Sequence, residues 1–273
     1  MLNSQIIINV KNLKVTIMKT IYVSLFLIIT HLISFAHASD LAKEKRWVDQ
    51  TVDFLVDGDA EWLDLGKHKA LAIYMESATD VTKGGVIVVH GSGVHPNWQD
   101  IVQPLRTSLP ESGWATLSIQ MPVLDNDADY KEYAPLFDEV KPRMDAAIKN
   151  LQDKGIKKIV IVAHSLGSAM SAYYLANEKN TSINAFVAIG MPGAREDKRM
   201  NTILSLQSIS VPVLDLYGEK DLESVIGSAK QRKQASSKNK KYSQKMVNGA
   251  DHFFVNKNEV LVNSVNDWLN DLK

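Results

Sequence analysis

An unbroken apolar run that ends at a serine is the feature that most constrains how this chain can fold. Residues Ile159 to Ala163 are all apolar and mostly β-branched, and His164 to Gly167 follow directly. Such a run is typical of a strand buried on both faces, as in a parallel sheet. A helical pattern, Ala169 to Asn177, begins immediately afterwards. We therefore expect a sharp turn from a central strand into a helix at Ser165.

The residues around Ser165 favour a nucleophile elbow. A tight turn brings the backbone close to itself, and Ala163 and Gly167 are small enough to permit this. In such an elbow the serine hydroxyl stands above the sheet, at the N-terminus of a helix whose free N–H groups stabilise negative charge. Ala163 replaces the usual first glycine of the motif and adds one methyl group. The alternative is a buried serine in an ordinary strand-to-helix turn.

The N-terminal segment has the features of a secretory signal peptide. A strongly apolar run, Ile21 to Ala36, follows Lys19, and an A-x-A site ends at Ala38. A basic start, a short apolar region and such a site define this class of signal. We expect translation to start at Met18, cleavage after Ala38, and a periplasmic or secreted product. The alternative is an uncleaved anchor, but a spanning helix needs about 20 apolar residues and this run is shorter.

Strand and helix patterns alternate along residues 39–273. This alternation predicts an α/β fold with a mostly parallel, twisted sheet and helices on both faces. Folds of this class commonly use about 250 residues as one domain, so we expect residues 39–273 to form a single domain. The segment between Ile189 and Val211 holds little more than one short helical pattern. No large cap domain is expected there.

Several local expectations accompany this pattern. Asp40 to Gly66 is a mixed, charged segment, and its expected inward contacts are Trp47, Phe54, Leu55 and Trp62. Leu71 to Met75 is expected to be an antiparallel strand at the sheet edge. Pro135 and Pro142 should break or kink the helical pattern from Tyr130 to Leu151. The basic segment Lys230 to Lys241 is expected to be a solvated helix and loop.

The composition excludes several kinds of site. The chain has no cysteine, which excludes disulfides, thiolate catalysis, cysteine zinc sites and a lipoprotein anchor. Its 31 basic and 31 acidic residues balance, so nothing indicates a nucleic-acid partner. Asp125 to Asp129 begins like a calcium loop, but Tyr130 and Leu136 stand where glycine and glutamate are required. We expect no metal and no cofactor, and no membrane span after signal cleavage.

Polar residues follow four of the predicted strands. They are Ser165, Asp221, His252 and the segment His90 to Gly93. The carboxyl ends of parallel strands meet at one edge of a sheet, where sites form. A serine hydroxyl needs a base to become nucleophilic, and the base needs an orienting acid. We predict that Ser165 is the nucleophile, His252 the base and Asp221 the orienting acid, with Leu166 and Ser92 donating backbone N–H groups to an oxyanion.

Each predicted role has an alternative. Asp221 is equally suited to cap a helix N-terminus, and Glu219 and Asp251 are rival acids. Asp251 ranks below Asp221 because side chains adjacent in sequence tend to point apart. His164 is expected to point away from the site. His90 and His95 are expected to shape the loop that contains them.

Together these motifs resemble the α/β hydrolase superfamily. The elbow, the His-Gly loop, Asp221 after a strand and the final Asp-His pair carry the resemblance, which extends from Leu71 to Lys273. More narrowly, the chain is similar to an uncharacterised, domain-of-unknown-function branch of exported bacterial α/β-hydrolase-like proteins. The local match lies in His90–Trp98, Leu105–Arg106 and Gly113–Ser118.

The resemblance implies serine hydrolysis through an acyl-enzyme. The substrate implied is a small-molecule or acyl ester, with a thioester or an amide as further alternatives. The rival hypothesis is a non-catalytic binding or envelope scaffold that keeps the fold, because fold alone does not imply function. Neither the superfamily motif nor the narrower branch indicates a particular substrate, and no sequence feature indicates an oligomeric state.

Overall fold

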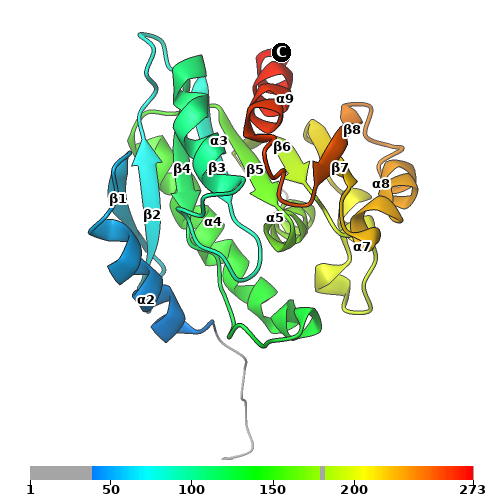
Figure 1. Ribbon diagram of the computed structural model, residues 1–273, viewed down its shortest axis with the longest axis horizontal. Coiled ribbons are helices and arrows are strands. Elements are labelled where there is room, and N and C mark those ends of the chain that lie inside the picture. The colour runs from blue at the N-terminus through cyan, green and yellow to red at the C-terminus, as the bar shows by residue number, and fades with distance from the viewer. Residues whose placement is uncertain (1–38, 179–181, 273) are drawn as a thin grey trace, which may run out of the picture. The chain divides into compact units, whose positions relative to one another are not determined.

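An eight-stranded sheet is the centre of the computed structural model, which describes residues 39–178 and 182–272 (Figure 1). The strands lie in the order β1-β2-β4-β3-β5-β6-β7-β8. The pairs β1–β2 and β2–β4 are antiparallel, and every pair from β4 to β8 is parallel. The strands are β1 (Asp59–Asp64), β2 (Lys69–Met75), β3 (Gly84–Val89), β4 (Trp114–Ile119), β5 (Ile159–His164), β6 (Ile183–Ile189), β7 (Val213–Lys220) and β8 (Tyr242–Asp251). The predicted mostly parallel α/β sheet is confirmed.

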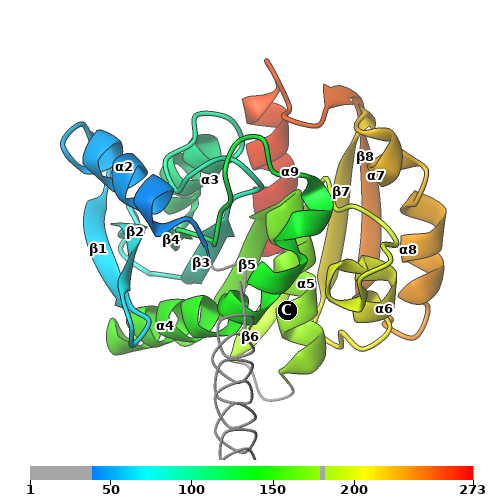
Figure 2. The same ribbon diagram turned by 90° about the horizontal axis from the view of Figure 1, so that it is seen from below.

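Helices cover both faces of this sheet. Figure 2 shows α3 and α9 on one side of the strands and α4 and α5 on the other. The α-helices are α2 (Leu41–Val52), α3 (Val102–Ser108), α4 (Val140–Asp153), α5 (Leu166–Asn177), α6 (Thr202–Leu206), α7 (Glu223–Ile226), α8 (Ala229–Ala235) and α9 (Asn258–Asn270). Among residues 39–178 and 182–272, three 3₁₀ segments accompany these helices: η1 (Leu109–Ser112), η2 (Tyr130–Glu139) and η3 (Lys198–Met200). The signal region predicted at residues 1–38 lies outside the described residues.

Burial on both faces explains the sequence of the central strands. All six residues of β5 are buried, and so are all six of β3 and of β4. Side chains alternate across a strand. Ile161 and Ala163 accordingly join the core on the α4 and α5 side, whereas Val160 and Val162 join the core on the α3 and α9 side. Two separate apolar cores thus hold β5 in place from opposite faces.

Prolines lie at the starts of two helices, and those in the helical pattern from Tyr130 to Leu151 break it as predicted from the sequence. Pro135 lies within the 3₁₀ segment η2, and the regular helix α4 starts only at Val140, with Pro142 in its first turn. Pro104 lies likewise in the first turn of α3. A proline in the first turn loses no helical hydrogen bond, because those N–H groups have no partner in the helix.

The N-terminal segment differs from the sequence-based expectation. Residues 41–64 form helix α2 and strand β1, so β1 is the edge strand and β2 is an inner one. Phe54 is 78% exposed and Trp62 is 48% exposed, so the predicted inward contacts are wrong at these positions. The buried residues of α2 include Lys43 and Glu44, and Glu44 pairs with the buried Arg143. The buried Glu44–Arg143 ion pair, and not the predicted aromatic contacts, holds this helix against the domain.

The basic segment at residues 230–241 is also not uniformly solvated. Arg232 on α8 is fully buried, and its Nε donates to the buried Asp215 carboxylate of β7 at 2.7 Å. Tyr242 and Gln244 of β8 donate to the same carboxylate oxygen. A solvated basic segment was the wrong expectation for Arg232, because a charge pattern does not reveal a partner 17 residues away. The pair fastens α8 to the last two strands.

The connection between β6 and β7 is short. It contains only η3 and α6 among helical segments, and residues 190–212 are all described. The expectation that no large cap domain is inserted there is confirmed. Within residues 39–178 and 182–272, no helix is long and apolar enough to cross a bilayer.

The Arg232–Asp215 pair predicts a large stability difference between neighbouring positions. Arg232→Ala should lower the free energy of unfolding by about 3–5 kcal/mol, because it leaves a buried carboxylate without its cation. Lys233→Ala, one position away on the exposed face of α8, should stay within about 0.5 kcal/mol of wild type. Urea unfolding followed by circular dichroism measures both variants. Equal losses would contradict a structural role for the pair.

Candidate active site

The turn at Ser165 has an unusual backbone. Ser165 lies between β5 and α5 with φ 51° and ψ −121°, in the region that favours glycine. Its N–H donates to the carbonyl oxygen of Ile189 at 2.9 Å, so the neighbouring strand β6 holds the turn. A Cβ at Gly167 would overlap the carbonyl oxygen of His90. This close approach explains why position 167, two residues after the serine, is a glycine. The positive φ of Ser165 is a strained conformation that persists where the surrounding structure fixes it.

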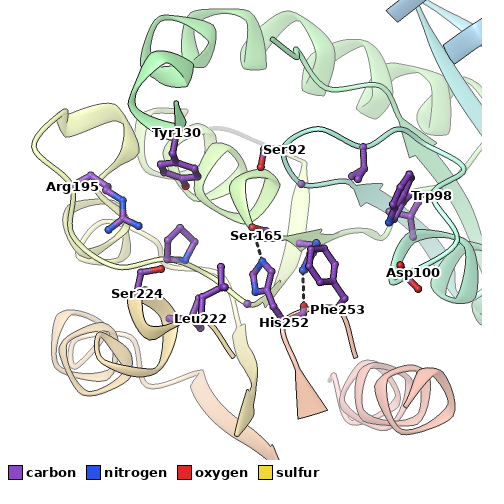
Figure 3. Close-up of a pocket in the computed structure, with 17 residues that line it drawn as sticks. Ser92, Trp98, Asp100, Tyr130, Ser165, Arg195, Leu222, Ser224, His252 and Phe253 are labelled. Atoms are coloured by element: carbon purple, nitrogen blue, oxygen red, sulfur yellow. Dashed lines mark hydrogen bonds between the residues drawn. The ribbon is translucent and has the colours of Figure 1, made fainter. Parts of the chain in front are cut away.

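Three polar side chains meet above the sheet edge. His252 Nε2 lies 2.9 Å from Ser165 Oγ, and His252 Nδ1 lies 2.6 Å from Asp221 Oδ1. Figure 3 shows the imidazole directed at the serine hydroxyl. His252 and Asp221 are buried, whereas Ser165 is half-buried and faces a pocket. The structure thus brings together the three residues singled out in the sequence, from the ends of β5, β7 and β8.

The carboxylate of Asp221 is held by several donors. Besides His252, the N–H of Leu222 donates to Oδ1 at 2.8 Å and the N–H of Gly218 donates to Oδ2 at 3.2 Å. Burial by itself would raise the pKa of this carboxyl, but the hydrogen bonds together outweigh burial and hold the pKa below its usual range. Asp221 is therefore ionised at neutral pH and fixes a proton on His252 Nδ1.

The rival acids hydrogen-bond elsewhere. Asp251 Oδ1 accepts from the N–H groups of Phe253 and Val255, and Glu219 Oε2 accepts from the N–H of Gly249. Both carboxylates stabilise the turns that carry His252. The geometry therefore favours Asp221 as the partner of the imidazole, as ranked from the sequence.

A glycine makes room for the imidazole. Gly190 follows β6 with φ +58°, and a Cβ there would lie 2.9 Å from the His252 ring. Its N–H donates to Leu216 of β7 at 2.8 Å. Gly190 is not among the site residues predicted from the sequence. The only signal available was a glycine directly after a predicted strand, at the same sheet edge as Ser165.

His90 shapes the loop after β3. It is fully buried, and its Nε2 accepts from the N–H of Met121 at 2.9 Å. The proton therefore belongs on Nδ1, which donates to the Gly91 carbonyl oxygen at 2.7 Å. Burial lowers the pKa of His90 to about 3, so it stays neutral. A neutral His90 couples the loops that follow β3 and β4.

His164 contradicts the expectation that it points away from the site. It lines the same pocket as Ser165, and its ring centroid lies 4.7 Å from that of His252. Its Nε2 donates to the His252 carbonyl oxygen at 3.0 Å, and burial lowers its pKa to about 3. The loop after β8 folds back over this face through positive φ angles at Phe254 and Asn256. Strand alternation cannot predict that return.

The two predicted oxyanion donors border the serine from different loops. Leu166 is the first residue of α5, where a backbone N–H has no earlier helical partner. Ser92 belongs to the loop after β3 and lies beside Ser165 in Figure 3. A Cβ at Gly91 would lie 3.1 Å from Ser165 Cβ, so the two loops are in contact. The loops that carry the two predicted donors therefore meet at Ser165, and their role as oxyanion donors stays a prediction.

The pocket above Ser165 has a volume of about 240 Å³. Tyr130 and Arg195 line one end of it, while Trp98 and Asp100 line the opposite end (Figure 3). Leu222, Val225 and Phe253 contribute apolar surface to the lining. In the part of the chain that the structure describes, no group of three or more histidine, aspartate or glutamate side chains could hold a metal ion.

A family model described as "Protein of unknown function (DUF3530)" matches residues 42–141 and 125–271. The chain belongs to this family. No curated protein sequence matches this DUF3530 protein. The family assignment agrees with the uncharacterised branch suggested by the sequence, and solved structures describe its fold.

The DUF3530 protein has the fold of α/β hydrolases. It is similar to a soluble variant of monoglyceride lipase from Saccharomyces cerevisiae, with 12% identity, a TM-score of 0.63, and coverage of 82% of this chain and 98% of that chain. An alpha-beta serine hydrolase homologue from Coxiella burnetii has 15% identity, a TM-score of 0.61 and coverage of 78% and 99%. An esterase from Pyrococcus furiosus has 15% identity, a TM-score of 0.61 and coverage of 78% and 92%.

The buried neutral histidines predict a specific pH dependence of stability. The unfolded chain binds protons at His90 and His164 below about pH 6.5, whereas the folded protein does so only near pH 3. The free energy of unfolding should therefore fall as pH drops from about 6.5 toward 3. His164→Gln should reduce the slope of unfolding free energy against pH by about 1.4 kcal/mol per pH unit, because the unfolded variant binds one proton fewer. Urea unfolding at pH 4, 5, 6 and 7 measures it; an unchanged slope would contradict the neutral state of His164.

Proposed function

We propose that this DUF3530 protein is a serine hydrolase that acts on esters through an acyl-enzyme at Ser165. The observation that carries the proposal is the pair of hydrogen bonds that join Ser165, His252 and Asp221. His252 Nε2 lies 2.9 Å from Ser165 Oγ, and His252 Nδ1 lies 2.6 Å from Asp221 Oδ1. A scaffold would need none of these three groups in contact. The positive φ at Ser165 supports the same conclusion, because it presents the hydroxyl to the pocket at a conformational cost.

The acylation step follows from the positions of the side chains. His252 Nε2 takes the proton of Ser165 as the serine oxygen attacks the ester carbonyl carbon. The carbonyl oxygen becomes negatively charged and accepts hydrogen bonds from the N–H groups of Leu166 and Ser92. Each such donor typically stabilises the transition state by about 3–4 kcal/mol. The tetrahedral intermediate then collapses, and His252 gives the proton to the departing alcohol.

Deacylation uses the same groups, with water in place of Ser165 as the nucleophile and Ser165 as the leaving group. Water enters the pocket, and His252 removes its proton as the oxygen attacks the acyl carbon. The Ser165 oxygen leaves and recovers its proton from His252, which releases the carboxylic acid. Throughout both steps the Asp221 carboxylate accepts a hydrogen bond from Nδ1–H of His252 and stabilises the imidazolium, without taking its proton.

Two observations support esters as the substrate class. The pocket is open and no cap domain lies between β6 and β7, which suits small or accessible substrates. The structural neighbours named above include an esterase and a monoglyceride lipase. Thioesters and amides could react by the same steps and differ only in their leaving groups.

Labelling with a fluorophosphonate tests the activated serine. The purified protein starting at Ser39 should be labelled and should hydrolyse p-nitrophenyl acetate and butyrate. Ser165→Ala and His252→Ala should each lose labelling and lower kcat by about 10⁴-fold or more, because the groups act as a unit. Labelling and turnover are measured on folded variants, verified by circular dichroism.

A matched serine in the same pocket serves as the control. Ser224 lines the pocket but has no hydrogen bond to the triad among the described residues; its carbonyl oxygen accepts from Ser228 Oγ. Ser224→Ala should keep full labelling. A folded wild type that is not labelled would favour the non-catalytic scaffold instead.

We also propose that the chain is exported and cut after Ala38, which yields a periplasmic or secreted enzyme. Ser39 is buried, and its backbone N–H donates to Glu139 Oε1 at 2.8 Å. Its hydroxyl also contacts Glu44. Two carboxylates, Glu44 and Glu139, surround the single guanidinium of Arg143, which leaves one negative charge uncompensated. Cleavage would convert the Ser39 N–H into an ammonium group that supplies the missing positive charge.

Chemical blocking of the new terminus tests this proposal. Protein with a free Ser39 should be about 1–2 kcal/mol more stable at pH 7 than protein with an acetylated Ser39, because acetylation keeps the N–H but removes the charge. The difference should fade above about pH 8, where an α-amino group loses its proton. Glu139→Gln should abolish it. N-terminal sequencing of the exported protein locates the cut directly, and a terminus other than Ser39 would refute the proposal.

A further inference from the structure

Arg195 has fewer hydrogen bonds than the other partly or fully buried arginines among the described residues. Its guanidinium has only one hydrogen bond to another described residue, to the carbonyl oxygen of the adjacent Ala194 at 3.0 Å. It forms no ion pair within residues 39–178 and 182–272. By contrast, its near neighbour Arg199 pairs with Asp197 at 2.8 Å. Arg106 also lacks an ion pair, but its guanidinium donates to Asn97 Oδ1 and to the Asp57 carbonyl oxygen. Arg195 is half-buried and lines the pocket above Ser165.

Tyr130 lies beside this arginine and has an unused donor. The Arg195 guanidinium carbon lies 5.2 Å from the centroid of the Tyr130 ring. The hydroxyl of Tyr130 is buried and has no hydrogen-bond partner in the described part of the protein. Buried polar groups normally have partners. Burial raises the pKa of Tyr130 to about 12, so the hydroxyl keeps its proton. An acceptor from outside the chain would satisfy it.

The charged side chains that line the pocket lie at opposite ends of it. Arg195 is the only lysine or arginine among the described residues that line the pocket, and Asp100 is the only carboxylate. Figure 3 shows Tyr130 and Arg195 on one side of Ser165 and Asp100 with Trp98 on the other. An anionic group would therefore be attracted to the first end and repelled from the second. Ser165 lies between the two ends, where an ester would react.

We propose that Arg195 and Tyr130 form a subsite that binds a carboxylate of the substrate. The inference rests on the proposed ester hydrolysis at Ser165 and names its substrate class: esters that bear a second, free carboxylate. The planar guanidinium matches a carboxylate geometrically, and the tyrosine hydroxyl donates to the same group. One cation matches a monoanion, whereas a phosphate dianion would leave a negative charge uncompensated.

Matched pairs of esters test the subsite. The first pair places the carboxylate on the acyl group: p-nitrophenyl hemiglutarate against the neutral p-nitrophenyl valerate. The second pair places it on the alcohol: 4-acetoxybenzoate against phenyl acetate. We expect a higher kcat/KM for the anionic member of one pair, which also shows which part of the substrate the subsite holds. No preference for the anion in either pair would overturn the proposal.

Substitutions connect the preference to the two residues. Arg195→Gln should lower kcat/KM for the preferred anionic ester by about 10- to 100-fold, mainly through KM, because a hydrogen bond to a charged group is lost. Hydrolysis of the neutral ester should change less than about threefold. Tyr130→Phe should act in the same direction with a smaller effect. Arg199→Gln, which removes an ion-paired guanidinium outside the pocket lining, should leave the ratio unchanged.

Two further readouts separate this inference from the function on which it rests. Fluorophosphonate labelling reports on Ser165 alone, so labelled protein without anion preference would refute only the subsite. Ser165→Ala cannot turn over substrate, yet it should bind the preferred anionic ester of the two pairs, and Arg195→Gln in that background should weaken binding by a similar 10- to 100-fold. Equal binding with and without Arg195, measured by calorimetry, would overturn the subsite.

Discussion

The left-handed backbone at Ser165 is the constraint on which the rest of the site depends. A residue with a side chain adopts this conformation only where its surroundings fix it. Here the two apolar cores hold β5 from both faces, and the carbonyl oxygen of Ile189 in β6 accepts a hydrogen bond from the Ser165 N–H. Gly167 then allows α5 to begin against the His90 loop. A strand that is buried along its whole length therefore supports a residue with an unfavourable backbone conformation.

Parallel pairing explains how residues distant in sequence become neighbours. Ser165 and His252 are 87 positions apart, and Asp221 and His252 are 31 apart, yet each follows a strand whose carboxyl end lies at the same edge. Small residues refine the result. Gly190 leaves space for the imidazole, and turns built on Asp251 and Glu219 position the loop that carries it. The sheet brings the groups near one another, and the loops complete the alignment.

Much of this could be predicted from the sequence, because strand periodicity and chain order are local signals. The α/β class, the turn at Ser165, the late helix starts at prolines and the choice of the three polar residues all follow from such signals. What could not be predicted depends on partners remote in sequence. Arg232 looks solvated until Asp215 is placed beside it, and α2 is anchored by Glu44 through Arg143. His164 was misplaced because a distant loop returns over it.

The hydrogen bonds of His90 extend beyond the pocket. Met121 donates to its imidazole, Gln120 contacts the same ring, and the Gln120 carbonyl accepts from Arg143, which pairs with Glu44. Ser39 is joined to this network through Glu44 and Val123. The first described residues of the chain are thus connected, without a gap in hydrogen bonding, to the loop that carries Ser92. Docking of the N-terminal helix and alignment of that loop therefore form one cooperative unit, in which loosening either end loosens the other.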